Sequence, residues 1–270
     1  MDFRGASADA VAALTEELKT AVSASPEAAA KAADTLFEVS QTLRAEAALR
    51  RFVTDASVPQ EAKTGLVGEL FGGKVDATGL GVFESAVKHR WTHAGDLSDA
   101  VERLSEIAAV RSAGGEAKRL ADELFAVQQA VQETPELRDA LSDPARTTED
   151  KAALVDTLLG GKALPATVTL TKQALAGTYR TASAALGEYQ KVAASVADEG
   201  TAVIRVAAPL SEAETTRLAA ALARKYGREV HLNVVVDPAV VGGIKVSIGD
   251  DVIDGTVSSR LEGAQRALAG

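Results

Sequence analysis

Over the first two hundred residues, apolar side chains recur every three or four positions, the spacing that places them on one face of an α-helix. One such stripe runs from Ala8 to Ser23 and stops before Ser25-Pro26. The same spacing predicts five further helices, marked by Leu36 and Val39, Leu49 and Phe52, Leu66 and Leu70, Leu80 and Phe83, and Leu97 and Leu104. Six successive amphipathic helices predict a helical bundle.

The helical region contains an internal repeat. Shifted by 88 residues without a gap, residues 33–74 match residues 121–162 at 17 of 42 positions. The matches include Leu49-Arg50 with Leu137-Arg138, and Gly72-Gly73-Lys74 with Gly160-Gly161-Lys162. A register kept over this length indicates a duplicated unit. We therefore predict two copies of one helical bundle, over residues 1–114 and residues 115–200.

The pattern changes after residue 200. Residues 201–208 alternate as a strand, and Ser211-Glu212-Ala213-Glu214 is a capping box that begins a helix ending near Tyr226-Gly227. Short strands follow at residues 232–236, 244–248 and 252–253, and Thr256 can cap a last helix. The predicted fold class is α+β and mainly α: two tandem helical bundles, followed by a small C-terminal α/β domain, residues 201–270, with the order strand, helix, three strands, helix.

Composition and charge narrow the possible functions. The formal net charge is −9, and residues 201–270 carry eight basic and eight acidic side chains, so the whole excess lies on the helical part. This surface is either simply solvated or an acidic face for a basic partner segment, and an acidic chain argues against a nucleic-acid partner. Without cysteine there is no disulfide or thiolate chemistry. The longest uncharged run, residues 163–171, is far below the ~20 residues of a membrane helix. We expect a soluble cytoplasmic protein that does not insert into the membrane.

One segment has the spacing of a phosphate-binding loop. Gly68 to Lys74 reads Gly-x4-Gly-Lys, but Val75 stands where the loop needs a magnesium-binding Ser or Thr. The segment ends a predicted helix, whereas a phosphate loop leads from a strand into a helix. In the second copy Asp156 replaces the first glycine and would repel a phosphate. We therefore expect a helix C-terminus here.

Other candidate sites also have plain structural explanations. His89 and His93 are four residues apart, but Arg90 replaces the glutamate of zinc proteases and no third ligand is evident. Trp91, between them, is expected to be either a core residue or an interface anchor. Asp250, Asp251 and Asp254 lack the ligand spacing of a calcium loop and suit a turn. We predict no catalytic, cofactor-binding or metal-binding residues.

The stretch VVVDPAVVGGIKVSIGDDVIDGTVSSRL, residues 234–261, resembles the C-terminal signature of the delta subunit of F-type ATP synthases, the family of the mitochondrial oligomycin-sensitivity-conferring protein. The family usually has Ser after the last Asp-Gly, and Thr256 keeps the hydroxyl. An ordinary delta subunit resembles the second copy plus the C-terminal domain, and the extra bundle resembles the duplicated domain of actinobacterial ATP synthases. Besides Pro209-Leu210-Ser211-Glu212, the signature residues are Asp237, Pro238, Gly242, Gly243, Gly249, Asp254, Gly255, Arg260 and Leu261.

The resemblance implies a non-catalytic stator subunit in the peripheral stalk of the proton-translocating ATP synthase, at the cytoplasmic face of the plasma membrane. It implies that the helical part holds N-terminal helices of the alpha subunits and that the C-terminal domain holds the ends of separate b subunits. The extra bundle lengthens or stiffens the stalk, or binds a second segment. The alternatives are a nucleotide-binding enzyme that uses Lys74, and a helical adaptor with an unrelated partner complex.

Overall fold

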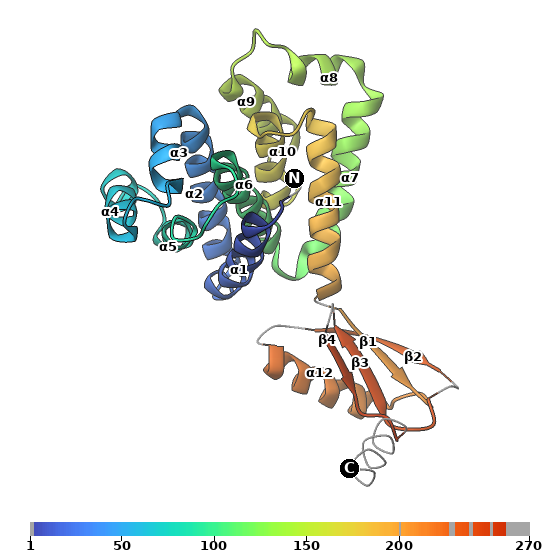
Figure 1. The fold of residues 1–270 in the computed structure, drawn as a ribbon. Coiled ribbons are helices and arrows are strands. Elements are labelled where there is room, and N and C mark those ends of the chain that lie inside the picture. Colours follow the sequence, from blue (N-terminus) through green and yellow to red (C-terminus); the bar gives the residue numbers. More distant parts are fainter. Residues whose placement is uncertain (1–2, 200, 227–229, 238–239, 249–250, 258–270) are drawn as a thin grey trace. The chain divides into compact units, whose positions relative to one another are not determined.

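The computed structural model describes residues 3–199, 201–226, 230–237, 240–248 and 251–257 (Figure 1). The chain forms two compact units, Met1–Ala193 and Ala194–Gly270. The first is built of helices and the second around a small sheet. This architecture confirms the predicted α+β, mainly α, fold class. The division of the helical part into residues 1–114 and 115–200 stays a prediction.

Several helices begin at a residue whose side chain caps the first turn. Ser25 accepts a hydrogen bond from the Ala28 backbone at 3.1 Å ahead of Pro26, and Asp76 accepts from the backbones of Thr78 and Gly79. Each of the six predicted helices is present. The described helices before the sheet are α1 (Ala6–Ala21), α2 (Pro26–Ala45), α3 (Ala47–Thr54), α4 (Gln60–Phe71), α5 (Ala77–Ala86), α6 (Ala94–Arg111), α7 (Ala117–Glu133), α8 (Pro135–Ser142), α9 (Thr148–Leu159), α10 (Pro165–Ala176) and α11 (Ala182–Glu199), with a 3-10 turn at Gly114–Glu116.

The 88-residue repeat recurs in the helix bounds. Shifting α3 and α4 by 88 residues gives the bounds of α8 and α9, and shifting α6 gives those of α11. The same shift moves the start of α1 to the start of α6. Helix α6 packs against α1, α2, α3 and α5, and also against α7 and α10. It therefore serves as the last helix of the first copy and as the first helix of the second.

Burial along α6 reflects this double role. Twelve of its eighteen residues are buried, whereas only four of the sixteen in α1 are. A helix that is buried on several faces belongs inside a core, while a helix buried along one stripe lies at a surface. The fully buried large side chains of the helical unit include Leu14, Leu18, Leu36, Phe83, Leu97, Leu104, Leu120, Leu124, Leu170 and Tyr189.

The described residues of the second unit form four strands in the order β2-β1-β3-β4 (Figure 1). These are β1 (Thr201–Val206), β2 (His231–Val236), β3 (Ile244–Ile248) and β4 (Asp251–Asp254). Strands β1 and β2 are parallel, because α12 (Glu212–Tyr226) provides the crossover, and the other pairs are antiparallel. Ile204 pairs with Val234 on one side and Val246 on the other. The predicted order of strand, helix and three strands is confirmed, and the predicted last helix lies outside the described residues.

The core of this unit lies on one face of the sheet. Ala202, Ile204 and Val206 of β1 alternate inward and pack with Val246, Ile248 and Leu222 of α12. The predicted capping box at the start of α12 is present, since the Ser211 backbone donates to Glu214 at 2.8 Å and Ser211 accepts from the Glu214 backbone at 3.3 Å. Among the described helices, none has the length and apolar character to cross a bilayer.

Candidate partner-binding site

Signature residues from three separate segments meet at one end of the sheet. Asp237 follows β2, and its backbone N–H donates to the Val206 carbonyl at the end of β1, at 2.9 Å. Gly242 and Gly243 precede β3, and Asp254 and Gly255 end β4. Antiparallel pairing of β3 with both neighbours brings these segments to the same end. The predicted signature residues Pro238, Gly249, Arg260 and Leu261, and the turn residue Asp250, lie outside the described residues.

Gly243 fits only because it has no side chain. Its φ is 84°, and a Cβ there would collide with the Gly255 carbonyl oxygen and lie 2.9 Å from Thr256 Cα. The crossing is fixed by two backbone hydrogen bonds, from Gly255 to Ile244 at 2.9 Å and from Val257 to Gly242 at 3.0 Å. The glycines thus allow the chain after β4 to lie directly against the start of β3.

The Asp254 carboxylate holds the turn after β4. Its Oδ1 accepts from the Thr256 backbone at 3.0 Å and from the Thr256 hydroxyl at 2.7 Å. Hydrogen bonds from the side chain and the backbone of Thr256 hold the pKa of Asp254 below its ordinary value. Any residue at 256 must supply a hydroxyl to make the shorter bond, which explains why threonine can stand in for serine.

The same end of the sheet exposes apolar side chains. Val236, Val241 and Val257 are 47%, 77% and 43% exposed. Val257 lies beside Gly242, where an added Cβ would meet its Cγ2 at 3.3 Å. Exposed apolar side chains at one end of a sheet can contribute to a contact surface for another chain. Sequence reasoning missed these valines, because their exposure depends on how the strand ends are placed.

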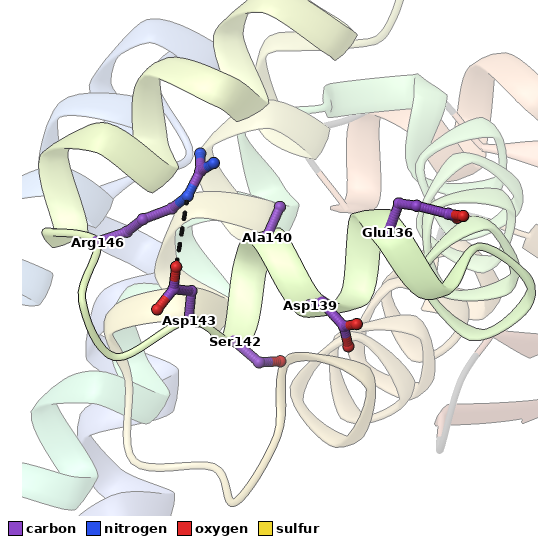
Figure 2. Close-up of a pocket in the computed structure, with 6 residues that line it drawn as sticks. All are labelled: Glu136, Asp139, Ala140, Ser142, Asp143 and Arg146. Carbon is purple, nitrogen blue, oxygen red and sulfur yellow. Dashed lines mark ion pairs between the residues drawn. The ribbon is translucent and has the colours of Figure 1, made fainter.

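A second feature is an acidic cleft in the helical unit (Figure 2). It is formed by α8 and the connection to α9, and it is lined by Glu136, Asp139, Ala140, Ser142, Asp143 and Arg146. Arg146 lies beside Asp143, with 3.8 Å between Nε and Oδ2. The first copy has Arg51 where Asp139 stands in the second, so the two copies differ in charge here. The cleft is an open charged surface and its side chains do not converge on one point.

The segment from Gly68 to Lys74 is the helix C-terminus that the sequence predicted. Helix α4 ends at Phe71, and Lys74 Nζ donates to the Leu70 carbonyl at 2.8 Å. The second copy repeats the arrangement, with Lys162 Nζ donating to the Leu158 carbonyl at 3.2 Å. Each lysine thus donates a hydrogen bond to a carbonyl that has no intrahelical partner at the helix C-terminus.

The two histidines do not share a helix face. His89 lies in the turn after α5, and His93 is the residue before α6. In the part of the chain that the structure describes, no three His, Cys, Asp or Glu side chains are grouped to hold a metal ion. Trp91, between the histidines, is half-buried, and its Nε1 donates to the Ala86 carbonyl at 3.0 Å. Its ring therefore helps to close the connection between α5 and α6.

Comparison with known proteins points to a single family. The family model described as ATP synthase delta (OSCP) subunit matches residues 104–268, from within α6 through the signature. An ATP synthase subunit delta from a Nocardioides species is 55% identical over 269 residues, which cover 99% of this chain and 98% of the relative. The ATP synthase subunit delta of Streptomyces griseus is 41% identical over 99% of this chain and 100% of its own length.

Both relatives match along nearly the whole chain, including the helices that precede residue 104. The resemblance inferred from the residues around Gly243 and Asp254 is therefore confirmed, as is the prediction of a subunit without catalytic activity. The chain belongs to the ATP synthase delta (OSCP) subunit family and is a non-catalytic component of the peripheral stalk of ATP synthase.

Proposed function

We propose that this subunit links the alpha/beta catalytic head of the proton-translocating ATP synthase to the b subunits, so that rotor torque drives ATP synthesis instead of turning the head. The helical part, residues 1–200, holds N-terminal helices of the alpha subunits, and residues 201–270 hold the C-terminal ends of the b subunits. The subunit then lies at the cytoplasmic face of the plasma membrane as a peripheral part of the complex.

The observation that supports b binding is the valine surface at the signature end of the sheet. Val241 and Val257 are exposed there next to the backbone crossing at Gly243 and Gly255, and Val236 is exposed at the same end of the sheet, at the end of β2. An amphipathic helix end can bury its apolar stripe against such a surface. Because residues 201–270 carry equal numbers of acidic and basic side chains, we infer that shape and apolar burial dominate this contact. The signature residues then act structurally, by building the surface.

A tether needs slow release. A stable interface buries ~1,200–2,000 Å² in total. Separate contacts of the helical part and the sheet unit within one complex raise the overall affinity, because the second contact forms at a high effective concentration. The subunit therefore needs no single very tight site to stay bound under torque.

Purification of the tagged subunit from solubilised membranes tests this proposal. The wild-type chain should bring alpha, beta and b subunits with it. Val241→Asp should keep alpha and beta but lose b, because a carboxylate replaces the most exposed of the three valines. Val252→Asp is the matched control: Val252 is also exposed, at 54%, but pairs with Ser247 away from the signature end, so b should stay.

Two results would contradict the proposal. Recovery of an unrelated complex without alpha, beta and b would favour the helical adaptor. Loss of b in both valine variants would show that the contact is not confined to the signature end. The nucleotide-binding alternative predicts that Lys74→Ala abolishes ATP binding by the isolated chain. We expect no binding to be lost, since Lys74 Nζ is engaged with the Leu70 carbonyl.

A further inference from the structure

Two fully buried carboxylates lie one turn apart on α6. The side chains of Glu102 and Glu106 are both inaccessible to solvent. Acidic side chains are almost never fully buried unless they are paired. Helix α6 is also the helix that both copies share, so these carboxylates lie where the first copy meets the second.

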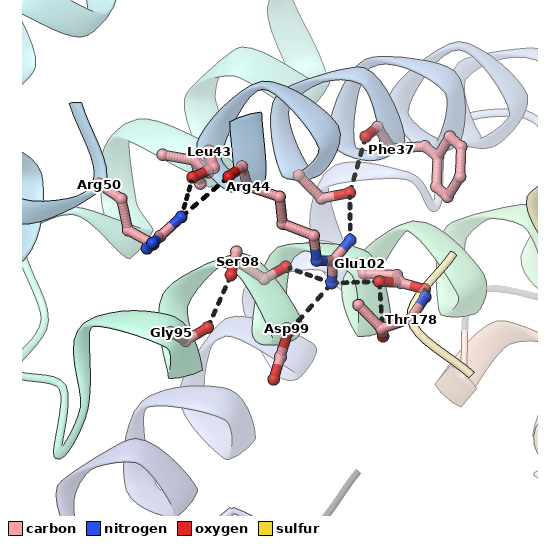
Figure 3. A network of polar contacts seen from close by, with 10 residues as sticks. Phe37, Leu43, Arg44, Arg50, Gly95, Ser98, Asp99, Glu102 and Thr178 are labelled. Atoms are coloured by element: carbon pink, nitrogen blue, oxygen red, sulfur yellow. Dashed lines mark hydrogen bonds and ion pairs between the residues drawn. The ribbon is translucent and has the colours of Figure 1, made fainter. Parts of the chain in front are cut away.

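Glu102 joins elements from the two copies (Figure 3). On the first-copy side it forms an ion pair with Arg44 of α2, whose guanidinium also contacts Asp99 Oδ1 at 3.1 Å. On the second-copy side it accepts from the backbone and the hydroxyl of Thr178, both at 3.0 Å. A Cβ on Gly177 would collide with this carboxylate, so glycine is needed for the close approach.

Ser105 makes a second link across α6. Its hydroxyl donates to the Ala33 carbonyl of α2 at 2.8 Å and accepts from Gln173 Nε2 of α10 at 2.8 Å. The polar side chains on this helix therefore tie α2 to α10 and to the segment that follows α10.

Glu106 lies one turn further along the same helix. It pairs with Arg103 at 2.8 Å and accepts from the Tyr179 hydroxyl at 3.3 Å. The Tyr179 ring packs edge-to-face on Tyr189 of α11, with 5.7 Å between centroids. Both tyrosines belong to the second copy, so Glu106 too contacts the segment between α10 and α11.

The repeat shows that a helical core does not need carboxylates at these positions. The residues 88 positions earlier, on α1, are Leu14 and Leu18, and both are fully buried. In α1, two leucines therefore fill the buried positions that Glu102 and Glu106 occupy in α6. The carboxylates occur on α6, where a second copy contacts the helix.

We propose that Glu102 and Glu106 form a proton-sensitive joint between the two helical copies, which is tight while Glu106 is protonated and loosens when Glu106 ionises. Burial raises the pKa of Glu106 to about 7, against the opposing effect of Arg103. Ionised Glu106 must be hydrated or fully paired, and its Oε1 is buried and accepts no hydrogen bond from the described residues. Moving the segment from Gly177 to Thr181 away from α6 would admit water.

The groups that face Glu106 fit this titration. Arg103 and Glu102 belong to α6, Tyr179 to the α10–α11 connection, and Tyr189 to α11. Burial raises the pKa of both tyrosines above the ordinary range, so they stay neutral when Glu106 ionises. Arg44 of α2 is committed to Glu102. The raised pKa of Glu106 thus lies near neutral pH, beside tyrosines that stay protonated.

Distances between spin labels in the full chain test the joint. The chain has no cysteine, so labels can be placed at exposed positions by Ala13→Cys in α1 and Ala153→Cys in α9, one in each copy. With a pKa of about 7, about a tenth of Glu106 is ionised at pH 6 and about nine-tenths at pH 8. The broad component of the between-copy distance distribution should grow accordingly. Glu106→Gln should keep the narrow distribution at both pH values.

Two controls separate the joint from general unfolding. Glu133→Gln removes an exposed carboxylate on α7 and should behave like the wild type. A label pair within the first copy, Ala13→Cys with Ala62→Cys, should give the same distribution at both pH values. The proposal fails if the between-copy distribution of the wild type does not change with pH, if Glu106→Gln changes as the wild type does, or if the within-copy pair broadens in parallel.

Discussion

Arg44 of α2 and Glu102 of α6 form an ion pair in which the carboxylate is completely buried and the arginine side chain is 20% exposed. The pair lies beside Thr178, which belongs to the next copy of the repeat. Removing one partner would leave a buried charge with only part of its compensation, which is far more costly than losing an exposed pair.

Arg44→Ala should therefore destabilise the helical unit by about 3 kcal/mol, because it leaves the buried Glu102 carboxylate without its ion-pair partner. The double variant Arg44→Leu with Glu102→Leu should recover most of this loss, since the equivalent residue on α1 is the buried Leu14. Denaturant unfolding of Arg44→Leu, Glu102→Leu and the double variant gives the coupling between the residues. Lys31→Ala, at the exposed Glu27–Lys31 pair, should leave the midpoint unchanged, and equal losses at both sites would contradict the argument.

The stability of the helical unit should fall as the pH rises from about 4.5 to about 7. Because Glu106 has a higher pKa in the folded chain than in the unfolded chain, the folded state retains a proton that the unfolded state releases. The raised pKa corresponds to about 3 kcal/mol of folding stability. This contribution is present in full at low pH and is lost as the pH rises through the pKa of Glu106 in the folded chain. Thermal unfolding of the wild type and of Glu106→Gln between pH 5 and 8 measures this difference, which should vanish in the variant.

Gly243→Val should disrupt the sheet unit and release the b subunits while the helical unit stays folded. The added side chain collides with the Gly255 carbonyl and imposes a strained φ. Gly255→Val should act in the same direction, because a Cβ there lies 3.1 Å from the Ile244 carbonyl. Circular dichroism and b recovery check both variants. Gly81→Ala in α5 meets nothing within 4 Å and is the tolerated control.

Thr256→Ser should leave the sheet unit unchanged, whereas Thr256→Val should lower its unfolding midpoint. Serine retains the hydroxyl that donates to Asp254 at 2.7 Å, and valine has the same shape without the donor. The hydrogen bond between Thr256 and Asp254 also predicts that the sheet unit loses stability in acid. With its pKa lowered by Thr256, Asp254 contributes stability above the ordinary carboxyl range, and this contribution is lost as the pH falls. Equal acid midpoints in the wild type and Thr256→Val would refute the assignment.

Helix positions in the first copy were predictable because apolar residues recur at helical spacing and clear stops, such as Pro26 or Gly72-Gly73, separate the stripes. The role of α6 was not predictable in this way. The detected identity covers residues 33–74 and their copies, and α1 and α6 lie outside it. In addition, Glu102 and Glu106 look like the polar face of an ordinary surface helix. A comparison of their positions with Leu14 and Leu18 was the available signal, and it requires extending the 88-residue shift to α1.

At the other site, the paired glycines before β3 correctly indicated a close backbone approach. The sequence could not name the neighbour, because Gly255 reaches Gly243 only through the antiparallel pairing of β3 and β4. The exposure of Val236 and Val241 could not be predicted either, because it depends on how the strands and loops are assembled. Alternation assigns a side chain to a face of a sheet, but whether anything covers that face depends on the assembled unit.

Because α6 belongs to two cores, the two repeats cannot melt separately. Unfolding of either repeat removes α6 from the core of the other. A calorimeter should therefore record one unfolding transition for the helical unit. A chain that begins at Ala94 would likewise leave Glu102 without Arg44. It would also expose to solvent the apolar residues of α6 that pack against the first repeat. The second repeat of this chain has thus become dependent on its predecessor.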